Sequence, residues 1–203
     1  MVTKLEAFSV PLFECDCPEP LVNRMAEYVK TLPFKENQYN NLQDGFIKDK
    51  ELIDWFNTCL DDLTKEIFGE VNFRLRVVQS WATKNKFSEY HGKHRHPNSI
   101  YSGILYLNTH NKKGETYFKL PNPWFFFENE SFFMVDHKQE KEVTYTYKSV
   151  KGKMILFPSV LFHGSNTNIQ HQDRYIIGFN SFFDGNVGSE ILATELNVNS
   201  RYI

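Results

Sequence analysis

Histidines crowd into one short stretch of the chain, and no other group of residues in it is better suited to do chemistry. The chain has seven histidines, and His91, His94 and His96 fall within six residues. Histidine is the commonest protein ligand for metal ions. In an extended segment His94 and His96 point to the same side, because side chains two residues apart share one face of a strand. Pro97 favours an extended backbone at His96, so these two imidazoles predict part of a metal site.

A third histidine completes the candidate site. His163 lies at the end of an apolar stretch and before a Gly-Ser turn, and a neighbouring strand in a small barrel would bring it against His94 and His96. Three histidines on one side of an ion leave positions open, which suits catalysis better than a closed structural site. His91 is out of phase with His94 in a strand, so we interpret it as a neighbouring or exposed group. The alternative is that this segment is a solvated loop without a metal.

Cysteines and charge exclude several other classes of protein. Cys15, Cys17 and Cys59 are an odd number and make no disulfide framework, and the C-x-C spacing lacks a second pair to close a zinc site. We interpret them as thiols of a reducing compartment and expect a cytoplasmic protein. The net charge of -2 gives no excess of basic residues of the kind that binds nucleic acid. No apolar run is long enough for a membrane span. The N-terminus lacks the features of a secretory signal.

The elements that must position the histidines fall into two halves. Apolar residues at helical spacing predict one helix between Pro20 and Pro33 and a second that ends near Gly69. After residue 70 the chain becomes rich in β-branched and aromatic residues, and the predicted strands cover 73–84, 99–108, 115–120, 142–150, 153–158 and 174–183. An early strand is expected within residues 1–15 and a loop over 35–48. This order favours a β-sandwich or barrel braced by two helices. We expect a single domain over 1–203, with helical support over about 1–70 and a β core over about 71–190.

Two blocks of this sequence resemble the 2-oxoglutarate/Fe(II)-dependent oxygenases. The segment HRHPNSIYSGILYLN is similar to the iron-bearing strand–loop–strand of that superfamily, in particular to a group with H-x-H-P followed by S-G-V-Y-Y. KGKMILFPSVLFHGSNTN and the later DRYIIGFN are similar to that group's second block, G-x-L-x-x-F-P-S-x-x-x-H and R-x-x-x-x-F-N. Gly114 and the stretch 121–123 resemble the segment between the blocks. The resemblance covers about residues 75–183 and implies a double-stranded β-helix (jelly-roll) core.

The resemblance implies a ligand set and a co-substrate site. His94 matches the first histidine of the family's H-x-D/E and His163 its distal histidine, while Arg174 matches the basic residue that binds the distal carboxylate of 2-oxoglutarate. An arginine suits this task because its planar guanidinium is always charged and bidentate. His96 departs from the pattern, since most of the superfamily has Asp or Glu there. We therefore expect His94, His96 and His163 to bind Fe(II) as catalytic metal ligands, a neutral set that leaves more positive charge on the metal.

Further residues are candidates for the pocket around this predicted centre. Ser99, Tyr106 and Asn108 lie on or near the strand after H-x-H and are predicted to hydrogen-bond 2-oxoglutarate, although Tyr106 is equally well explained as a core residue. Trp81 and Gln79 are in phase on the preceding strand and are predicted to line the pocket. The aromatic run 122–133 is either a core strand or a lid that excludes water.

The resemblance implies an oxidoreductase, a dioxygenase that uses Fe(II), 2-oxoglutarate and O2 and couples oxidative decarboxylation of 2-oxoglutarate to C–H hydroxylation. The substrate is unknown, a small molecule or a protein side chain, with neither nucleic acid nor membrane as partner. Two other classes stay open: a three-histidine, cupin-like metalloenzyme that does not use 2-oxoglutarate, and a non-catalytic jelly-roll binding or structural module. A two-fold homodimer is expected only from its general frequency.

Overall fold

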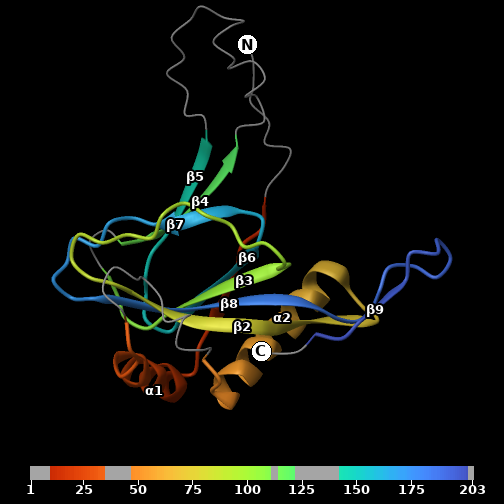
Figure 1. The fold of residues 1–203 in the computed structure, drawn as a ribbon, viewed down its shortest axis with the longest axis horizontal. Coiled ribbons are helices and arrows are strands. Elements are labelled where there is room, and N and C mark those ends of the chain that lie inside the picture. The colour runs from red at the N-terminus through yellow and green to blue at the C-terminus, as the bar shows by residue number, and fades with distance from the viewer. Residues whose placement is uncertain (1–9, 35–46, 111–113, 122–141, 201–203) are drawn as a thin grey trace, which may run out of the picture.

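Three layers make up the protein. The computed structural model describes residues 10–34, 47–110, 114–121 and 142–200. Figure 1 shows two helices against one face of a larger sheet and a smaller sheet on the other side. None of the helices in these ranges is long and apolar enough to cross a bilayer. The mainly β, antiparallel architecture braced by two helices confirms the jelly-roll expected from the sequence.

Two amphipathic helices form the outer layer. Helix α1 spans Glu19–Lys30 and α2 spans Lys50–Phe68. The Asp49 carboxylate caps α2 by accepting the Leu52 N–H at 2.9 Å, and Gly69 ends the helix with a positive φ of 70°. The apolar stripes of both helices pack into one core with the larger sheet, so the prediction that they are packing faces is confirmed.

The larger sheet contains six strands with β1, β6, β3, β8 and β2 side by side in that order, and β9 added to β8. Their bounds are β1 Phe13–Asp16, β2 Phe73–Asn85, β3 Tyr101–Tyr106, β6 Lys153–Pro158, β8 Arg174–Val187 and β9 Leu196–Val198. Every neighbouring pair is antiparallel. The smaller sheet has the order β5–β4–β7, with β4 Thr116–Pro121, β5 Glu142–Tyr147 and β7 Phe162–Ser165.

Side chains alternate between the two faces of the larger sheet, so the interior contains one core against the helices and a second against the smaller sheet. In β3, Leu105 faces the helices, whereas Ile104 and Tyr106 face the smaller sheet. In β8, Ile177 faces the helices and Ile176 the smaller sheet. Successive residues of a strand point to opposite faces, so each central strand contributes to both cores. The space between the two sheets is where the predicted site residues can meet.

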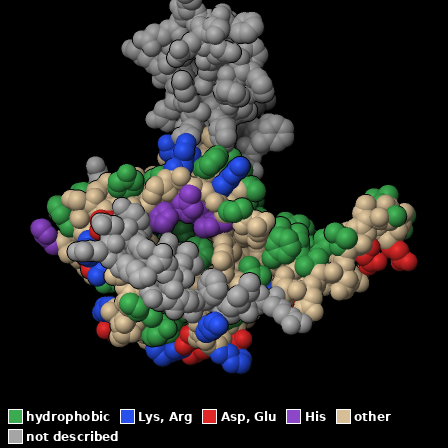
Figure 2. Space-filling model, in the orientation of Figure 1, with side chains coloured by type: hydrophobic (Ala, Val, Ile, Leu, Met, Phe, Trp, Pro, Cys, Tyr) green, Lys and Arg blue, Asp and Glu red, His purple; other side chains and the backbone are tan. Residues whose placement is uncertain are grey.

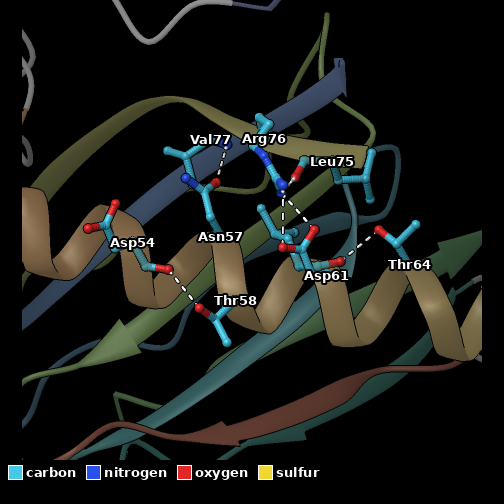
Figure 3. Close-up of polar contacts among 9 residues, drawn as sticks. Asp54, Asn57, Thr58, Asp61, Thr64, Leu75, Arg76 and Val77 are labelled. Carbon is cyan, nitrogen blue, oxygen red and sulfur yellow. Dashed lines mark hydrogen bonds and ion pairs between the residues drawn. The ribbon is translucent and has the colours of Figure 1, made fainter. Parts of the chain in front are cut away.

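A β-bulge in β2 changes which residues face that space. The register shifts between Val77 and Gln79, and the Val77 N–H donates to Asn57 of α2 at 3.0 Å (Figure 3). Val77 packs with the helices, but beyond the bulge Ala82 does so, and Trp81 lines the inter-sheet cavity. One extra residue reverses the alternation. The ion pair of Arg76 with Asp61 of α2, also drawn in Figure 3, holds this part of β2 against the helix.

The predicted elements differ from the observed ones mainly at their ends. His163 lies on the separate short strand β7, not at the end of the preceding apolar strand, because the chain turns at residues 159–161. β9 was not predicted, and β8 continues four residues beyond the predicted end at 183. The expected loop 35–48, the region 1–9 and the aromatic run 122–133 lie wholly or largely outside the described residues.

Candidate metal centre

Three histidines from two distant parts of the chain meet between the sheets. The candidate ligand atoms of His94, His96 and His163 all lie within 4.8 Å of one another. His94 and His163 form an isolated antiparallel bridge, with each backbone N–H 2.9 Å from the other's carbonyl oxygen. The His96 N–H donates to the Ser159 carbonyl at 3.0 Å. The H-x-H segment is therefore fixed beside β7 by backbone hydrogen bonds, and Figure 2 shows a group of histidine side chains on one face of the molecule.

Hydrogen bonds to backbone carbonyls orient two of the three rings. His94 Nδ1 lies 2.9 Å from the Gly92 carbonyl oxygen, and His163 Nδ1 lies 3.1 Å from that of Leu161. A carbonyl can only accept, so Nδ1 carries the proton in both rings and each Nε2 keeps its lone pair. Metal-binding histidines commonly have this arrangement.

The nitrogen spacing fits a single ion. His96 Nε2 and His163 Nε2 are 3.1 Å apart. Two nitrogens that bind one ion at right angles, each at about 2.1 Å, are about 3 Å apart. This pair of nitrogens therefore has the spacing expected for two imidazole ligands of one metal ion, and a candidate ligand atom of His94 lies within 4.8 Å of both.

Burial keeps these imidazoles neutral. Desolvation, reinforced by His94 and His96, lowers the pKa of His163 to about 2. Desolvation with His94 and His91 lowers the pKa of His96 to about 4, and burial also lowers the pKa of His94. Only the unprotonated ring can bind a metal. At neutral pH all three rings are therefore in the form that binds.

Arg174 brings a buried positive charge to the same cavity. Its side chain is only 3% exposed and donates to Ser149 Oγ, Asn85 Oδ1 and Thr116 Oγ1 at 3.1–3.3 Å. Within the described part of the chain no carboxylate forms an ion pair with it, and the neighbouring Asp173 pairs with Lys84 instead. Burial lowers the pKa of Arg174, partly opposed by Tyr106 and Glu115. A buried cation without an anionic partner is costly to a fold.

The histidines and Arg174 line one cavity that is open to solvent. Its wall comprises Trp81, Thr83, His91, His94, His96, Gly103, Ile104, Thr116, His163, Gly164, Ser165, Arg174, Ile176 and Gly178. Gly178 of β8 is needed for close packing, because a Cβ there would lie 2.8 Å from the Trp81 ring. Trp81 in turn contacts His96, with ring centroids 5.4 Å apart. Of the two residues predicted to line the pocket, Trp81 does so.

The three residues predicted to hydrogen-bond 2-oxoglutarate lie in different places. Tyr106 is fully buried and donates to Thr116 Oγ1 at 2.6 Å, so it supports a residue of the cavity wall from behind. Asn108 lies beyond the end of β3, where its amide donates to the Asp173 carbonyl and accepts from the Tyr175 N–H. Ser99 lies before β3 and bonds with Ser159.

The structure thus brings neither Ser99 nor Asn108 to the cavity. Gln79 does not reach it either, because its amide accepts from Asn180 at 2.6 Å. Sequence reasoning correspondingly missed Asn85, Thr116 and Ser149, which hold Arg174. They come from three separate segments and share no motif, so spacing gave no signal for them.

His91 is a neighbour of the centre, the first of the two interpretations that its phase allowed. It lines the cavity, and its ring centroid is 4.5 Å from that of His94. Its N–H donates to Ser165 Oγ and its carbonyl accepts the Ser165 N–H. These bonds place a fourth imidazole beside the three candidate ligands but outside their ligand group.

Comparisons with known proteins agree with the geometry. Residues 79–180, half of the chain, match the profile of the family described as "Putative 2OG-Fe(II) oxygenase". This range contains the three candidate ligands and Arg174. No curated protein matches the chain in sequence.

Solved structures share the fold at low identity. HygX from Streptomyces hygroscopicus with iron bound is 12% identical with a TM-score of 0.55, covering 85% of this chain and 82% of its own. A prolyl-4-hydroxylase from Pseudomonas putida is 14% identical with a TM-score of 0.52, covering 85% and 92%. SnoN, a non-heme alpha-ketoglutarate-dependent epimerase from nogalamycin biosynthesis, is 12% identical with a TM-score of 0.58, covering 85% and 78%. At these identities the likeness establishes the fold.

Proposed function

The chain belongs to the 2-oxoglutarate/Fe(II) oxygenase family, and from this membership we propose that it hydroxylates a C–H bond of an as yet unidentified substrate. The family's metal cofactor is Fe(II), and 2-oxoglutarate and O2 are its co-substrates. When bound, the iron activates O2 while 2-oxoglutarate is oxidised to succinate and CO2, and the protein contributes binding, orientation and exclusion of water.

In this proposal His94, His96 and His163 hold Fe(II) through one ring nitrogen each. Support comes from the spacing of their nitrogens, the backbone hydrogen bonds that leave Nε2 of His94 and His163 available, and their lowered pKa values. Three imidazoles occupy one side of an ion and leave the cavity side open. Co-substrate and O2 would enter from that side.

Arg174 would bind the distal carboxylate of 2-oxoglutarate, and it carries the proposal. Its guanidinium is buried, charged and without an anionic partner among the described residues, yet it lies on the wall that the histidines share. Three neutral oxygens hold the group in place, so its fork is oriented before the ligand arrives. Trp81, Ile104 and Ile176 supply apolar wall that excludes water from the reaction.

One structural neighbour suggests a second outcome of the same chemistry. SnoN is an epimerase that depends on alpha-ketoglutarate, so hydrogen abstraction in this fold need not end in hydroxyl transfer. The discriminating observation is the product once a substrate is known. A product heavier by one oxygen supports hydroxylation, whereas a stereoisomer of unchanged mass supports epimerisation.

We include the domain organisation and the setting of the protein in the proposal. The two cores share the central strands of the larger sheet, which supports a single catalytic domain. Cys15, Cys17 and Cys59 are free thiols, which supports work in a reducing compartment such as the cytoplasm. The substrate is a small molecule or a protein side chain.

An anaerobic titration tests the proposed site directly. Metal-free protein is given Fe(II) and then 2-oxoglutarate while visible absorbance is recorded. A weak charge-transfer band that needs both additions, and that is absent in His163→Ala, is the expected result. Fe(II) binding without this band would favour the three-histidine metalloenzyme, and no metal binding would refute both enzymes and leave a jelly-roll binding module.

A further inference from the structure

The described wall of the cavity is positively charged and contains no carboxylate. Its ionisable residues are four histidines and Arg174. The two acids nearest to the histidines in sequence point elsewhere: Glu89 accepts the Lys86 N–H, and Glu115 accepts from the Asn166 amide. Glu115 acts on Arg174 only as a neighbouring charge that raises its pKa, and it does not line the cavity.

This composition leaves the loaded site with an excess of positive charge. The proposed imidazole ligands are neutral, so they cancel none of the charge of Fe(II). The two positive charges of the metal and the one of Arg174 exceed the two negative charges of 2-oxoglutarate by one. With an aspartate at position 96 the total would be balanced. An unbalanced charge in a partly buried site favours the binding of a counter-charge.

Cations next to the ligands add to this potential. Lys93 and Arg95 alternate with His94 and His96, and both lie over the Phe162 ring, at 5.4 and 5.3 Å from its centroid. Figure 2 shows lysine and arginine side chains close to the histidine group, over the smaller sheet. Clustered charge of one sign near a cavity raises the local concentration of ligands of the opposite sign.

We infer that the substrate carries an anionic group, a carboxylate or a phosphate, which binds beside the metal and neutralises the loaded site. This inference rests on the proposed function, since it counts the charges of Fe(II) and 2-oxoglutarate. It narrows the substrate class, because it excludes neutral and cationic compounds. His96 is then the residue that determines the charge preference.

Anion binding to the loaded protein tests the inference without any turnover. The protein is held without O2 as its complex with Fe(II) and 2-oxoglutarate, and acetate, inorganic phosphate, chloride and the neutral acetamide are added separately. The shift in wavelength of the charge-transfer band, followed as each compound is added, gives the dissociation constant of that compound. Acetate or phosphate is expected to bind at least about tenfold more tightly than acetamide. In His96→Asp the dissociation constants of acetate and phosphate should rise about tenfold, whereas that of acetamide should stay the same. Metal content is measured alongside.

A second pair of variants keeps the ligand set intact. Lys93→Gln should weaken acetate binding about twofold, whereas Lys50→Gln, which removes the same charge at the start of α2, should leave it unchanged. If acetate and phosphate bind no better than acetamide, or if His96→Asp binds them as tightly, the inference is wrong. Binding of chloride alone would also overturn it, because the charge would then be met by a free halide. Failure of the band to form at all would instead refute the proposed function.

Discussion

Replacing Arg174 with methionine is expected to separate two properties that normally decline together: affinity for 2-oxoglutarate and stability of the fold. In the ligand-free protein Arg174 is a buried cation whose partners among the described residues are all neutral. An apolar side chain of similar length removes the cost of burying the charge, often a gain of about 1–4 kcal/mol. It also removes a donor from three oxygens, of which Thr116 Oγ1 keeps the Tyr106 hydroxyl, so the cost is about 1–3 kcal/mol for each of the other two. Because the gain and the cost are of similar size, the free energy of unfolding should change by no more than about 2 kcal/mol.

The effect on 2-oxoglutarate should be much larger. Removing one partner of a buried, hydrogen-bonded charge pair costs about 2–5 kcal/mol, which corresponds to a dissociation constant raised about 30-fold to several thousand-fold. Arg174→Lys keeps the charge but loses the planar fork, so its affinity should lie between those of the wild type and Arg174→Met. Fe(II) binding, which depends on the histidines, should be unchanged in both variants.

The assay combines the anaerobic charge-transfer titration with urea unfolding of the metal-free protein. Lys84→Met is the matched control, since Lys84 pairs with Asp173, the residue before Arg174, and does not line the cavity. Its dissociation constant for 2-oxoglutarate should stay within about twofold of the wild type. The reasoning is refuted if Arg174→Met binds 2-oxoglutarate within about threefold of the wild type, or if it loses about 3–5 kcal/mol of stability as a structural arginine would.

Three further predictions concern the metal, the pH and the core. His163→Ala should retain no Fe(II) after dialysis, measured by metal analysis, because one of two facing nitrogens is lost. The metal-free protein should lose stability as the pH falls from 6.5 towards 4. His91 and His96 have pKa values of about 4 in the folded protein, so over this range only the unfolded chain takes up their protons, and each residue should lower the free energy of unfolding by up to about 1.4 kcal/mol per pH unit. Urea midpoints that do not change over this range would contradict the prediction. Leu60→Ala, at a fully buried position of α2, should cost about 2–5 kcal/mol while leaving Fe(II) stoichiometry intact, and a smaller loss would mean that α2 is not part of the core.

Much of the fold follows from patterns that the chain carries locally. The helical stripe of α2 is complete between an aspartate cap and a glycine end, so its prediction needed no tertiary information. Strand β3 alternates cleanly between the two cores. The bulge in β2 is different, because it depends on pairing with β8 and on Asn57 of α2 accepting the Val77 N–H. Neither partner is near Val77 in sequence, so no local pattern revealed the bulge itself, although the sequence did predict that Trp81 lines the pocket.

The site shows a similar division. His94 and His96 were predictable because their spacing determines their direction once the segment is extended. Asn108 was assigned by the same two-residue period as Tyr106, and Ser99 by its place near the strand, but both lie outside β3, which spans Tyr101–Tyr106. Short polar side chains at strand ends tend to bond with neighbouring backbone, and the Asn108 amide bonds the backbone of Asp173 and Tyr175. The two-residue period predicts the direction of a side chain only for residues within the strand.

The charges of the cavity distinguish between the three functions that the sequence left open. A binding or structural module would gain nothing from a buried guanidinium that no carboxylate of the described residues pairs with, or from imidazoles kept neutral by burial, since both arrangements reduce stability. A three-histidine metalloenzyme without 2-oxoglutarate would account for the imidazoles, because a metal offsets their cost, but it would leave Arg174 unexplained. A metal together with a dianionic co-substrate offsets both costs within one cavity. The buried cation is therefore the feature that favours the 2-oxoglutarate oxygenase over the other two functions.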